Sequence, residues 1–266
     1  MKLTIAIAQM QVVPSDPAGN IVKMEQFIQA AKKRGADLVV FPEDAICGPL
    51  SGQTAFLAEA PGYLAHMQRL AVTYGVDLVP GTWTVGDGIA LYNQAHYITS
   101  DGIVAGVYRK IHLWETEQAV ITPGTSVAVF PTRFGMVGMV ICWDLAFPPM
   151  FTAMNHLGVE LVISPTYWSH PLEVPGTLDA PNAEQQDIDL IDSLCTARAF
   201  ENDIVLVYCN AAGTLSLPGS EATLSGRSQI THPIDKVVCR SQGNDEELLV
   251  VEVSHQRASA MSALPA

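Results

Sequence analysis

The stretch from Met136 to Tyr167 constrains the fold of this chain more than any other. It opens with a continuous apolar run, 136–141, of the length that a fully buried strand needs, and Cys142 ends that run. Phe147-Pro148-Pro149 then opens a helix, because proline is tolerated in a first turn, and a second apolar run follows at 159–164. The pattern predicts a β–turn–α–β unit, from which α/β folds are built.

Cys142 stands at the exit of the first of these strands. A strand end presents its residue to a crevice while the sheet holds it rigid. Backbone N–H groups at a helix start favour a thiolate, so Cys142 is a candidate nucleophile. A free cysteine taken alone is more often a small, inert, buried side chain, and its partners elsewhere in the chain decide between the two interpretations.

Composition excludes several classes of function. With 14 basic and 27 acidic residues in 266, the net charge is −13, which argues against nucleic acid and anionic membranes as partners. No apolar run is long enough to span a bilayer, and the alternating N-terminus resembles a first strand rather than a signal peptide. The five cysteines are widely spaced, which suits free thiols in a reducing cytoplasm. No metal-ligand spacing and no phosphate-binding glycine loop is present, so we expect no metal and no cofactor.

The order of the remaining elements predicts one mixed-sheet α/β domain over residues 1–266, with two sheets and helices outside them. Strands alternate with helices early, and hairpins dominate late. The expected early elements are a strand at 3–13, a helix capped by Asn20, a strand at 37–41, a helix over 53–74, a strand at 77–85 and a hairpin across Asp101-Gly102. We expect a long loop at 169–189, serving as a lid, a subunit contact or a plain surface insertion, before a helix at 190–200.

Three strand exits carry Glu43, Lys110 and Cys142. Each is ordinary by itself, since a lone Lys is usually solvated and a lone Glu usually lies in a surface turn. Together they supply a carboxylate base, a cation for an oxyanion and a thiol, which is the set that activated-nucleophile chemistry needs.

At these residues the chain resembles the nitrilase, or carbon–nitrogen hydrolase, superfamily. FPED at 41–44, YRKIHLW at 108–114 and VICWDLAFP at 140–148 are similar to the family's glutamate, lysine and cysteine motifs. Glu117 matches the second glutamate of many members, and three more segments, TARAFEN, YCNAAG and SGRS, match in the same order. The resemblance covers nearly the whole chain. It implies a four-layer αββα sandwich, a homodimer or larger assembly, and cleavage of a non-peptide C–N bond.

The resemblance also implies roles for the residues. Cys142 attacks the carbonyl or carbamoyl carbon, Glu43 moves the protons, Lys110 and the Trp143 N–H hold the oxyanion, and Glu117 orients Lys110 and substrate. The side chains expected to bind substrate are Trp143, Asp144, Phe147, Tyr167 and Trp168.

Departures from the family pattern bear on the substrate. Leu145 and Ala146 stand where many carbamoyl amino acid hydrolases carry arginines, which disfavours a substrate carboxylate held there. Asp144, two residues after the nucleophile, favours amides over nitriles. Pro149 and Arg227 also depart from the pattern, at positions that shape the pocket or a dimer contact. We expect a cytoplasmic amidohydrolase of small linear amides; the alternatives are a ureido (N-carbamoyl) hydrolase, a nitrilase and a non-catalytic dimeric binding protein.

Overall fold

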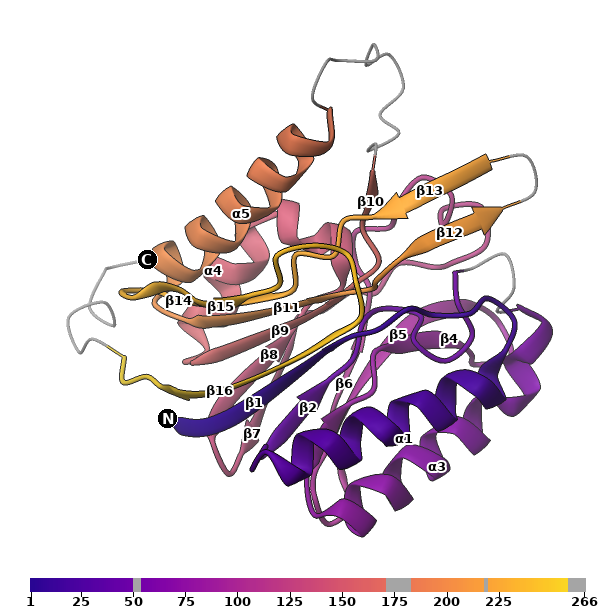
Figure 1. The fold of residues 1–266 in the computed structure, drawn as a ribbon, viewed down its shortest axis with the longest axis horizontal. Coiled ribbons are helices and arrows are strands. Elements are labelled where there is room, and N and C mark those ends of the chain that lie inside the picture. The colour runs from indigo at the N-terminus through magenta and orange to yellow at the C-terminus, as the bar shows by residue number, and fades with distance from the viewer. Residues whose placement is uncertain (50–53, 171–182, 218–219, 258–266) are drawn as a thin grey trace.

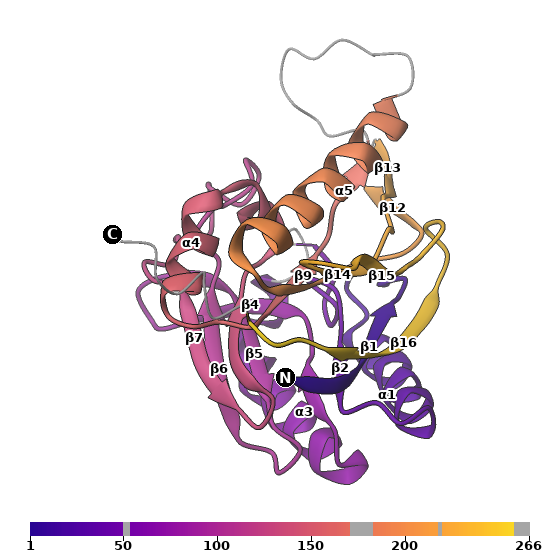
Figure 2. The same ribbon diagram turned by 90° about the vertical axis from the view of Figure 1, so that its left-hand side faces the viewer.

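The structure, a computed structural model, describes residues 1–49, 54–170, 183–217 and 220–257. Two mixed sheets stack face to face, and a pair of helices covers the outer face of each (Figures 1 and 2). The layers therefore run α, β, β, α, and the predicted four-layer sandwich is confirmed.

The first sheet has seven strands, in the order β16, β1, β2, β3, β5, β4, with β6 also paired to β5. Their bounds are β1 Lys2–Gln9, β2 Leu38–Val40, β3 Asp77–Val79, β4 Thr82–Gly86, β5 Leu91–Ile98, β6 Val104–Arg109 and β16 Glu247–Ser254. Strands β1, β2 and β3 are parallel, while β16 pairs with β1 antiparallel over the whole length of both. The first and last described strands are thus neighbours.

The second sheet has six strands, in the order β15, β14, β11, β9, β8, β7. Their bounds are β7 Ala128–Thr132, β8 Gly135–Met139, β9 Leu161–Thr166, β11 Val205–Asn210, β14 Gln229–His232 and β15 Lys236–Arg240. The central strands β8, β9 and β11 are parallel, and every residue of β9 and β11 is buried, as expected for strands covered on both faces. A small third sheet joins β10 Ser169–His170, β13 Ser220–Leu224 and β12 Thr214–Leu217.

Two helices cover each large sheet. Helices α1 (Pro17–Lys33) and α3 (Ala60–Tyr74) lie on the first, and α4 (Pro148–His156) and α5 (Ala183–Asn202) lie on the second (Figure 1). Short 3-10 turns, η1 (Thr54–Glu59) and η2 (Cys142–Ala146), precede α3 and α4. No helix in the described ranges is long and apolar enough to cross a membrane.

The apolar core lies between the two sheets and continues under the helices. Ile5, Val40, Val137, Ile163 and Val207 belong to one buried cluster that spans both sheets. Each such side chain contributes about 1.5–3 kcal/mol through its removal from water. This packing fixes the two sheets against each other, and therefore fixes the loops at their ends.

The helix start expected at Asn20 is wrong. Asp16 caps α1 instead, by accepting a hydrogen bond from the backbone N–H of Gly19, and Pro17 occupies the first turn. Asn20 is buried inside the helix, where its amide donates to the carbonyls of Val13 and Ile46. The rule that Asn favours N-caps was outweighed by a second capping residue just before a proline.

The single strand expected at 77–85 is two strands. Pro80-Gly81 separates β3 from β4, and the two do not pair with each other in the sheet. Gly81 has φ +75°, and a Cβ at this position would lie 1.9 Å from the carbonyl oxygen of Pro42. Only glycine fits so close to that backbone. This close packing of Gly81 on Pro42 holds the segment before Glu43 against the turn between β3 and β4.

The loop expected at 169–189 is shorter than predicted within the described residues. Ser169–His170 forms strand β10, and α5 begins at Ala183 rather than at 190. Residues 171–182, the middle of that prediction, lie outside the described residues. The polar, acidic composition of 183–189 hid the helix, because it lacks the apolar periodicity by which helices are recognised.

Candidate active site

Three strand ends deliver the reactive side chains to one buried place. Glu43 follows β2, Lys110 follows β6 directly, and Cys142 opens η2 beyond β8. Glu117 comes from the turn after the lysine segment. Glu43, Lys110 and Glu117 are 3%, 2% and 8% exposed, so two carboxylates and one ammonium share a nearly water-free site. Three charges buried this deeply require mutual pairing.

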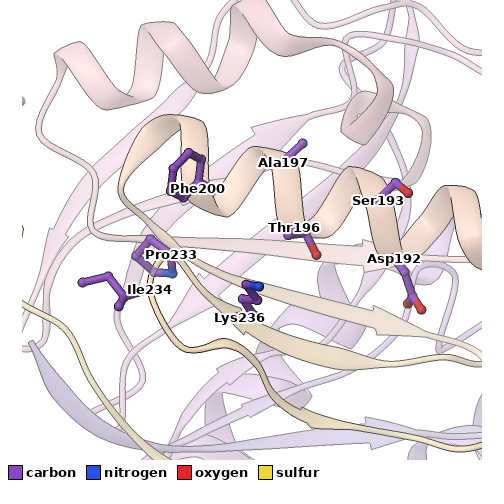
Figure 3. Close-up of a pocket in the computed structure, with 8 residues that line it drawn as sticks. All are labelled: Asp192, Ser193, Thr196, Ala197, Phe200, Pro233, Ile234 and Lys236. Atoms are coloured by element: carbon purple, nitrogen blue, oxygen red, sulfur yellow. The ribbon is translucent and has the colours of Figure 1, made fainter.

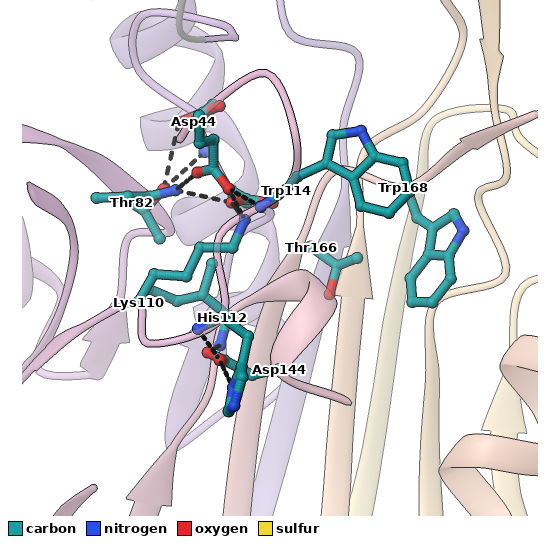
Figure 4. Close-up of polar contacts among 12 residues, drawn as sticks. Asp44, Thr82, Lys110, His112, Trp114, Asp144, Thr166 and Trp168 are labelled. Carbon is teal, nitrogen blue, oxygen red and sulfur yellow. Dashed lines mark hydrogen bonds and ion pairs between the residues drawn. The ribbon is translucent and has the colours of Figure 1, made fainter. Parts of the chain in front are cut away.

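Lys110 joins the two glutamates. Its Nζ lies 2.9 Å from Glu43 Oε1 and 2.7 Å from Glu117 Oε2, and Figure 4 shows the lysine reaching up to these contacts. The backbone N–H of Trp114 donates to the same Glu117 oxygen at 2.8 Å. Glu43 also lies close enough to Cys142 for the two side chains to shift each other's pKa. Three of the four residues that the sequence singled out are thus joined by direct contacts, and the fourth, Cys142, is coupled to them electrostatically.

Asn93, on β5, completes this network, and sequence reasoning missed it. Its amide nitrogen donates to Glu43 Oε1 at 2.8 Å and to Glu117 Oε1 at 2.9 Å. Its backbone carbonyl accepts from the N–H of Lys110, which is the strand pairing that sets the lysine beside it. An asparagine within a strand carries no sequence signal of its own. Only the pairing of β5 with β6 would have shown it.

Cys142 has φ +48°, a left-handed conformation that non-glycine residues seldom adopt. Such strain costs about 1–3 kcal/mol and persists where surrounding structure enforces it, often at functional sites. Burial, and then the negative charge of Glu43, raises the pKa of the Cys142 thiol well above its usual value, although Lys110 opposes them. The expectation of a thiolate favoured by a helix start is therefore wrong, because burial and the charge of Glu43 both favour the protonated thiol.

The charges of the base and the cation depend on each other. Burial raises the pKa of Glu43 above its ordinary 4.5, and the charge of Lys110 only partly offsets this. Burial lowers the pKa of Lys110, but Glu43, Cys142 and Glu117 outweigh it and raise that pKa well above its usual value. Lys110 therefore stays an ammonium, and Glu43 can accept a proton near neutral pH more readily than an ordinary glutamate.

Asp144 links the lysine segment to the cysteine turn. Its Oδ2 accepts from Tyr108 Oη at 2.7 Å and from the N–H of Ile141 at 2.9 Å. Its Oδ1 lies 2.9 Å from the N–H of His112 and 2.8 Å from His112 Nδ1 (Figure 4). Asp144 is fully buried, and all four contacts are to protein groups. These contacts fix Tyr108 and His112, which flank Lys110 two residues away on either side, and Ile141, the residue before Cys142.

Comparisons with known proteins identify the family and the fold. The family model of the carbon-nitrogen hydrolases matches residues 4–263. The chain belongs to the carbon-nitrogen hydrolase family. A probable nitrilase of Schizosaccharomyces pombe is 33% identical over 90% of this chain and 84% of its own length. An N-carbamoylputrescine amidase of Solanum tuberosum is 28% identical over 93% of this chain and 85% of its own.

A solved structure shows the same fold. An amidase of Nesterenkonia AN1, from the nitrilase superfamily, superposes with a TM-score of 0.79 at 24% identity, covering 94% of this chain and 90% of that one. The resemblance inferred from the motifs is thereby confirmed at the level of family and fold. The αββα architecture of this carbon-nitrogen hydrolase is that of the nitrilase superfamily.

Aromatic side chains surround the turn that carries the cysteine of this hydrolase. Trp143 meets Trp114 at 4.8 Å and Trp168 at 5.6 Å between ring centroids, both edge to face. Phe147 stacks on His112 at 3.5 Å. Figure 4 shows Trp114 and Trp168 on the side of the site where Thr166 lies. Trp143, Phe147 and Tyr167 are partly exposed and Trp168 is buried, so the partly exposed ones form an apolar wall that a ligand can touch.

A separate hollow of about 640 Å³ lies between α5 and the turn that joins β14 to β15, and none of the catalytic candidates lines it. It is lined by Asp192, Ser193, Thr196, Ala197, Phe200, Pro233, Ile234 and Lys236 (Figure 3). Phe200 and Ile234 are 70% and 75% exposed, which is unusual for large apolar side chains gathered at one place. Within the described ranges, no group of three or more His, Cys, Asp or Glu side chains is arranged to hold a metal ion.

Proposed function

We propose that this hydrolase cleaves small linear amides through a thioester at Cys142 and releases ammonia. The observation that carries the proposal is the ion pair of Glu43 with Lys110, together with the mutual effect of Glu43 and the Cys142 thiol on each other's pKa. A base, a buried cation and a thiol gathered at one place form the set that nucleophilic acyl transfer needs. The raised thiol pKa fits a mechanism in which Glu43 removes the proton as sulfur attacks, rather than one with a preformed thiolate.

The steps follow from the contacts. Sulfur bonds to the carbonyl carbon, Glu43 takes the thiol proton, and negative charge develops on the carbonyl oxygen. Lys110 Nζ and the N–H of Trp143, in the first turn of η2 where N–H groups lack helical partners, stabilise that oxyanion. Glu43 returns the proton to the nitrogen as the C–N bond breaks, and ammonia leaves. Water then attacks the thioester, Glu43 accepts its proton, and the acid leaves as the thiol is restored.

Glu117 and Asp144 take supporting roles in this proposal. Glu117 is saturated by Lys110, Asn93 and the N–H of Trp114, so it holds the ammonium in place. Asp144 is fully buried among protein donors, which supports a positioning role in place of the substrate contact expected from sequence. Trp143, Phe147 and Tyr167 remain the candidates for contact with the acyl chain, with Trp168 packed behind Trp143.

A ureido substrate is the second candidate. The relative from Solanum tuberosum is named for action on an N-carbamoyl amine, and the same residues can attack a carbamoyl carbon. Release of carbon dioxide together with ammonia distinguishes this reaction from amide cleavage. Nitriles remain a third possibility suggested by the relative from Schizosaccharomyces pombe, and Asp144 is the residue that argues against them.

The test is an ammonia-release screen over amides, ureido compounds and nitriles, with carbon dioxide measured in parallel. We expect turnover of short-chain amides by the native protein, and a covalent adduct of acyl mass on the peptide that contains Cys142. Cys142→Ala should abolish both. Turnover retained in Cys142→Ala would contradict the nucleophile, and carbon dioxide release without amide turnover would favour the ureido candidate.

We also propose that two copies pair through the hollow on α5. Phe200 and Ile234 lie exposed there, and burying them against the same face of a second copy removes both from water (Figure 3). Phe200→Asp should convert a dimer to a monomer in light scattering. Ile89→Asp, at a 98% exposed position on another part of the surface, is the matched control and should leave the mass unchanged. A monomeric native protein would refute the pairing.

The five cysteines are free thiols in the structure. We propose a cytoplasmic location on this ground, because free thiols persist in reducing compartments.

A further inference from the structure

The side chain of Asn93 bridges the two carboxylates of the site without adding a charge. Lys110 Nζ and Asn93 Nδ2 each contact both Glu43 and Glu117, so the four side chains form a closed ring of hydrogen bonds. Lys110 contributes a positive charge to this ring, whereas Asn93 contributes only N–H groups. Two carboxylates bridged twice in this way are held at a fixed separation.

The orientation of the Asn93 amide follows from its partners. Both contacts to carboxylate oxygens require N–H donors, so Nδ2 faces the glutamates and Oδ1 faces away from them. Oδ1 is buried and has no hydrogen-bond partner among the described residues, although Asn93 is only 5% exposed. The two bonds that Nδ2 donates therefore hold this side chain, rather than any bond that Oδ1 accepts.

Both contacts that Glu43 receives from the ring fall on one oxygen. Lys110 Nζ and Asn93 Nδ2 each bind Oε1, so two donors fix the orientation of this carboxylate. Removing Asn93 leaves Oε1 held by Lys110 without the amide donor, and the carboxylate is oriented less tightly. The amide therefore bears on both the direction and the ionisation of the base.

We propose that Asn93 is a positioning residue that orients Glu43 toward Cys142 and favours its ionised form. The proposal rests on the proposed function, since it assigns Glu43 as the base. Donated hydrogen bonds stabilise a carboxylate over its acid. Loss of the donor raises the pKa of Glu43. The acid limb of the pH–rate profile, in which the rate rises with pH as Glu43 ionises, then moves to higher pH.

The titratable groups that interact with Glu43 are Lys110, Glu117, the Cys142 thiol, Tyr167 and Tyr208. Asn93 donates to Glu117 as well, so its substitution also removes a donor from that second carboxylate. Asn93→Asp keeps the size of the side chain but replaces the N–H donor with an acidic oxygen that faces two carboxylates. Asn93→Ala removes the donor and adds no charge. The shift should be larger for Asn93→Asp than for Asn93→Ala.

The experiment measures the pH dependence of Cys142 alkylation by iodoacetamide, read by mass spectrometry of the Cys142 peptide, together with kcat/KM for an amide. In the native protein, both should rise through the same acid limb. In Asn93→Asp and Asn93→Ala both limbs should move to higher pH. Above the limb, where Glu43 is ionised in every variant, kcat/KM should still be lower by about 100-fold, the typical effect of misplacing a reacting group by about 1 Å. KM should change little.

Gln94→Glu is the matched control. It lies next to Asn93 on the same strand, makes the same amide-to-acid change, and contacts His96 and Arg109 rather than the glutamates. Its pH limb should equal that of the native protein. The proposal is overturned if both Asn93 variants keep the native limb, or if Gln94→Glu shifts it equally.

The alkylation measurement distinguishes failure of the proposed function from failure of the proposed role of Asn93. If no amide, ureido compound or nitrile is hydrolysed, the proposed function fails, yet the alkylation profile still reports on Glu43 and Cys142. A shift of that profile in the Asn93 variants supports the positioning role even then. If the protein hydrolyses an amide but the pH profiles of the Asn93 variants match the native one, the proposed function is supported and the role of Asn93 is refuted.

Discussion

Replacing Asp144 with asparagine should weaken both the fold and the reaction. The Asp144 carboxylate makes four contacts between 2.7 and 2.9 Å, with Tyr108, Ile141 and His112, the last through two atoms. In Asp144→Asn the amide oxygen keeps the two donors on its side. The amide nitrogen faces the other two partners, and one of them, the backbone N–H of Ile141 or of His112, cannot accept from it.

The magnitude follows from the one hydrogen bond that the amide nitrogen cannot replace. A hydrogen bond to a charged group contributes about 1.5–3 kcal/mol, and its removal lowers the free energy of unfolding by that amount. For a chain of this size each kcal/mol shifts Tm by about 2–4 °C, so Tm should fall by at least about 3 °C. Because the hydrogen bonds of Asp144 tie the lysine segment to the cysteine turn, kcat of the folded fraction should fall by about 100-fold as well.

Asp77→Asn separates stability from catalysis. Asp77 is equally buried and accepts from Tyr97 Oη at 2.8 Å and from the N–H of Ser100 at 2.9 Å, but it lies on β3, and these partners are outside the catalytic network. Thermal unfolding followed by circular dichroism should show a comparable decrease of Tm in both variants, with kcat reduced only in Asp144→Asn. If Asp144→Asn keeps its native Tm and kcat, or if Asp77→Asn lowers kcat as much, the assigned role is wrong.

Two further predictions concern the charges of the site. Lys110→Met should lower kcat by about 10²–10³-fold, the usual effect of removing one oxyanion donor, and steady-state kinetics on an amide should show this; near-native kcat would exclude Lys110 from the oxyanion site. The pH profile should also carry the signature of Glu43. Because burial raises the pKa of Glu43 and the base must be ionised, kcat/KM should decline on acidification at a pH above 4.5, and a limb at or below that value would contradict the burial argument.

The sequence predicted the unit around Cys142 and the family well, because both depend on local features. Apolar runs with sharp ends mark buried strands, and the residue just past each end is visible without knowing the fold. Glu43, Lys110 and Cys142 were each found in this way; in the structure Lys110 pairs with Glu43, and the Cys142 thiol affects the pKa of both. Glu117 came from the spacing of the family motif rather than from any local signal.

What the sequence did not predict depends on pairings between distant segments. Asn93 matters because β5 lies beside β6, and the role of Asp144 depends on Tyr108 reaching it from the other sheet. Neither pairing has a local signature. The protonation state of Cys142 was predicted wrongly for a related reason, since burial is set by the packing of both sheets and not by the turn itself.

The pairing of β1 with β16 bears on how the chain folds as it is made. The backbone groups of Met1 and His255, 254 positions apart, hydrogen-bond to each other. Translation must therefore pass β16 before β1 can pair with it. Until then β1 has an unpaired edge of backbone N–H and C=O groups, and such edges promote aggregation of incompletely folded chains. Closure across so long a separation is slow. A chain truncated before 247 should accordingly be recovered in aggregates, while one ending just past His255 should not.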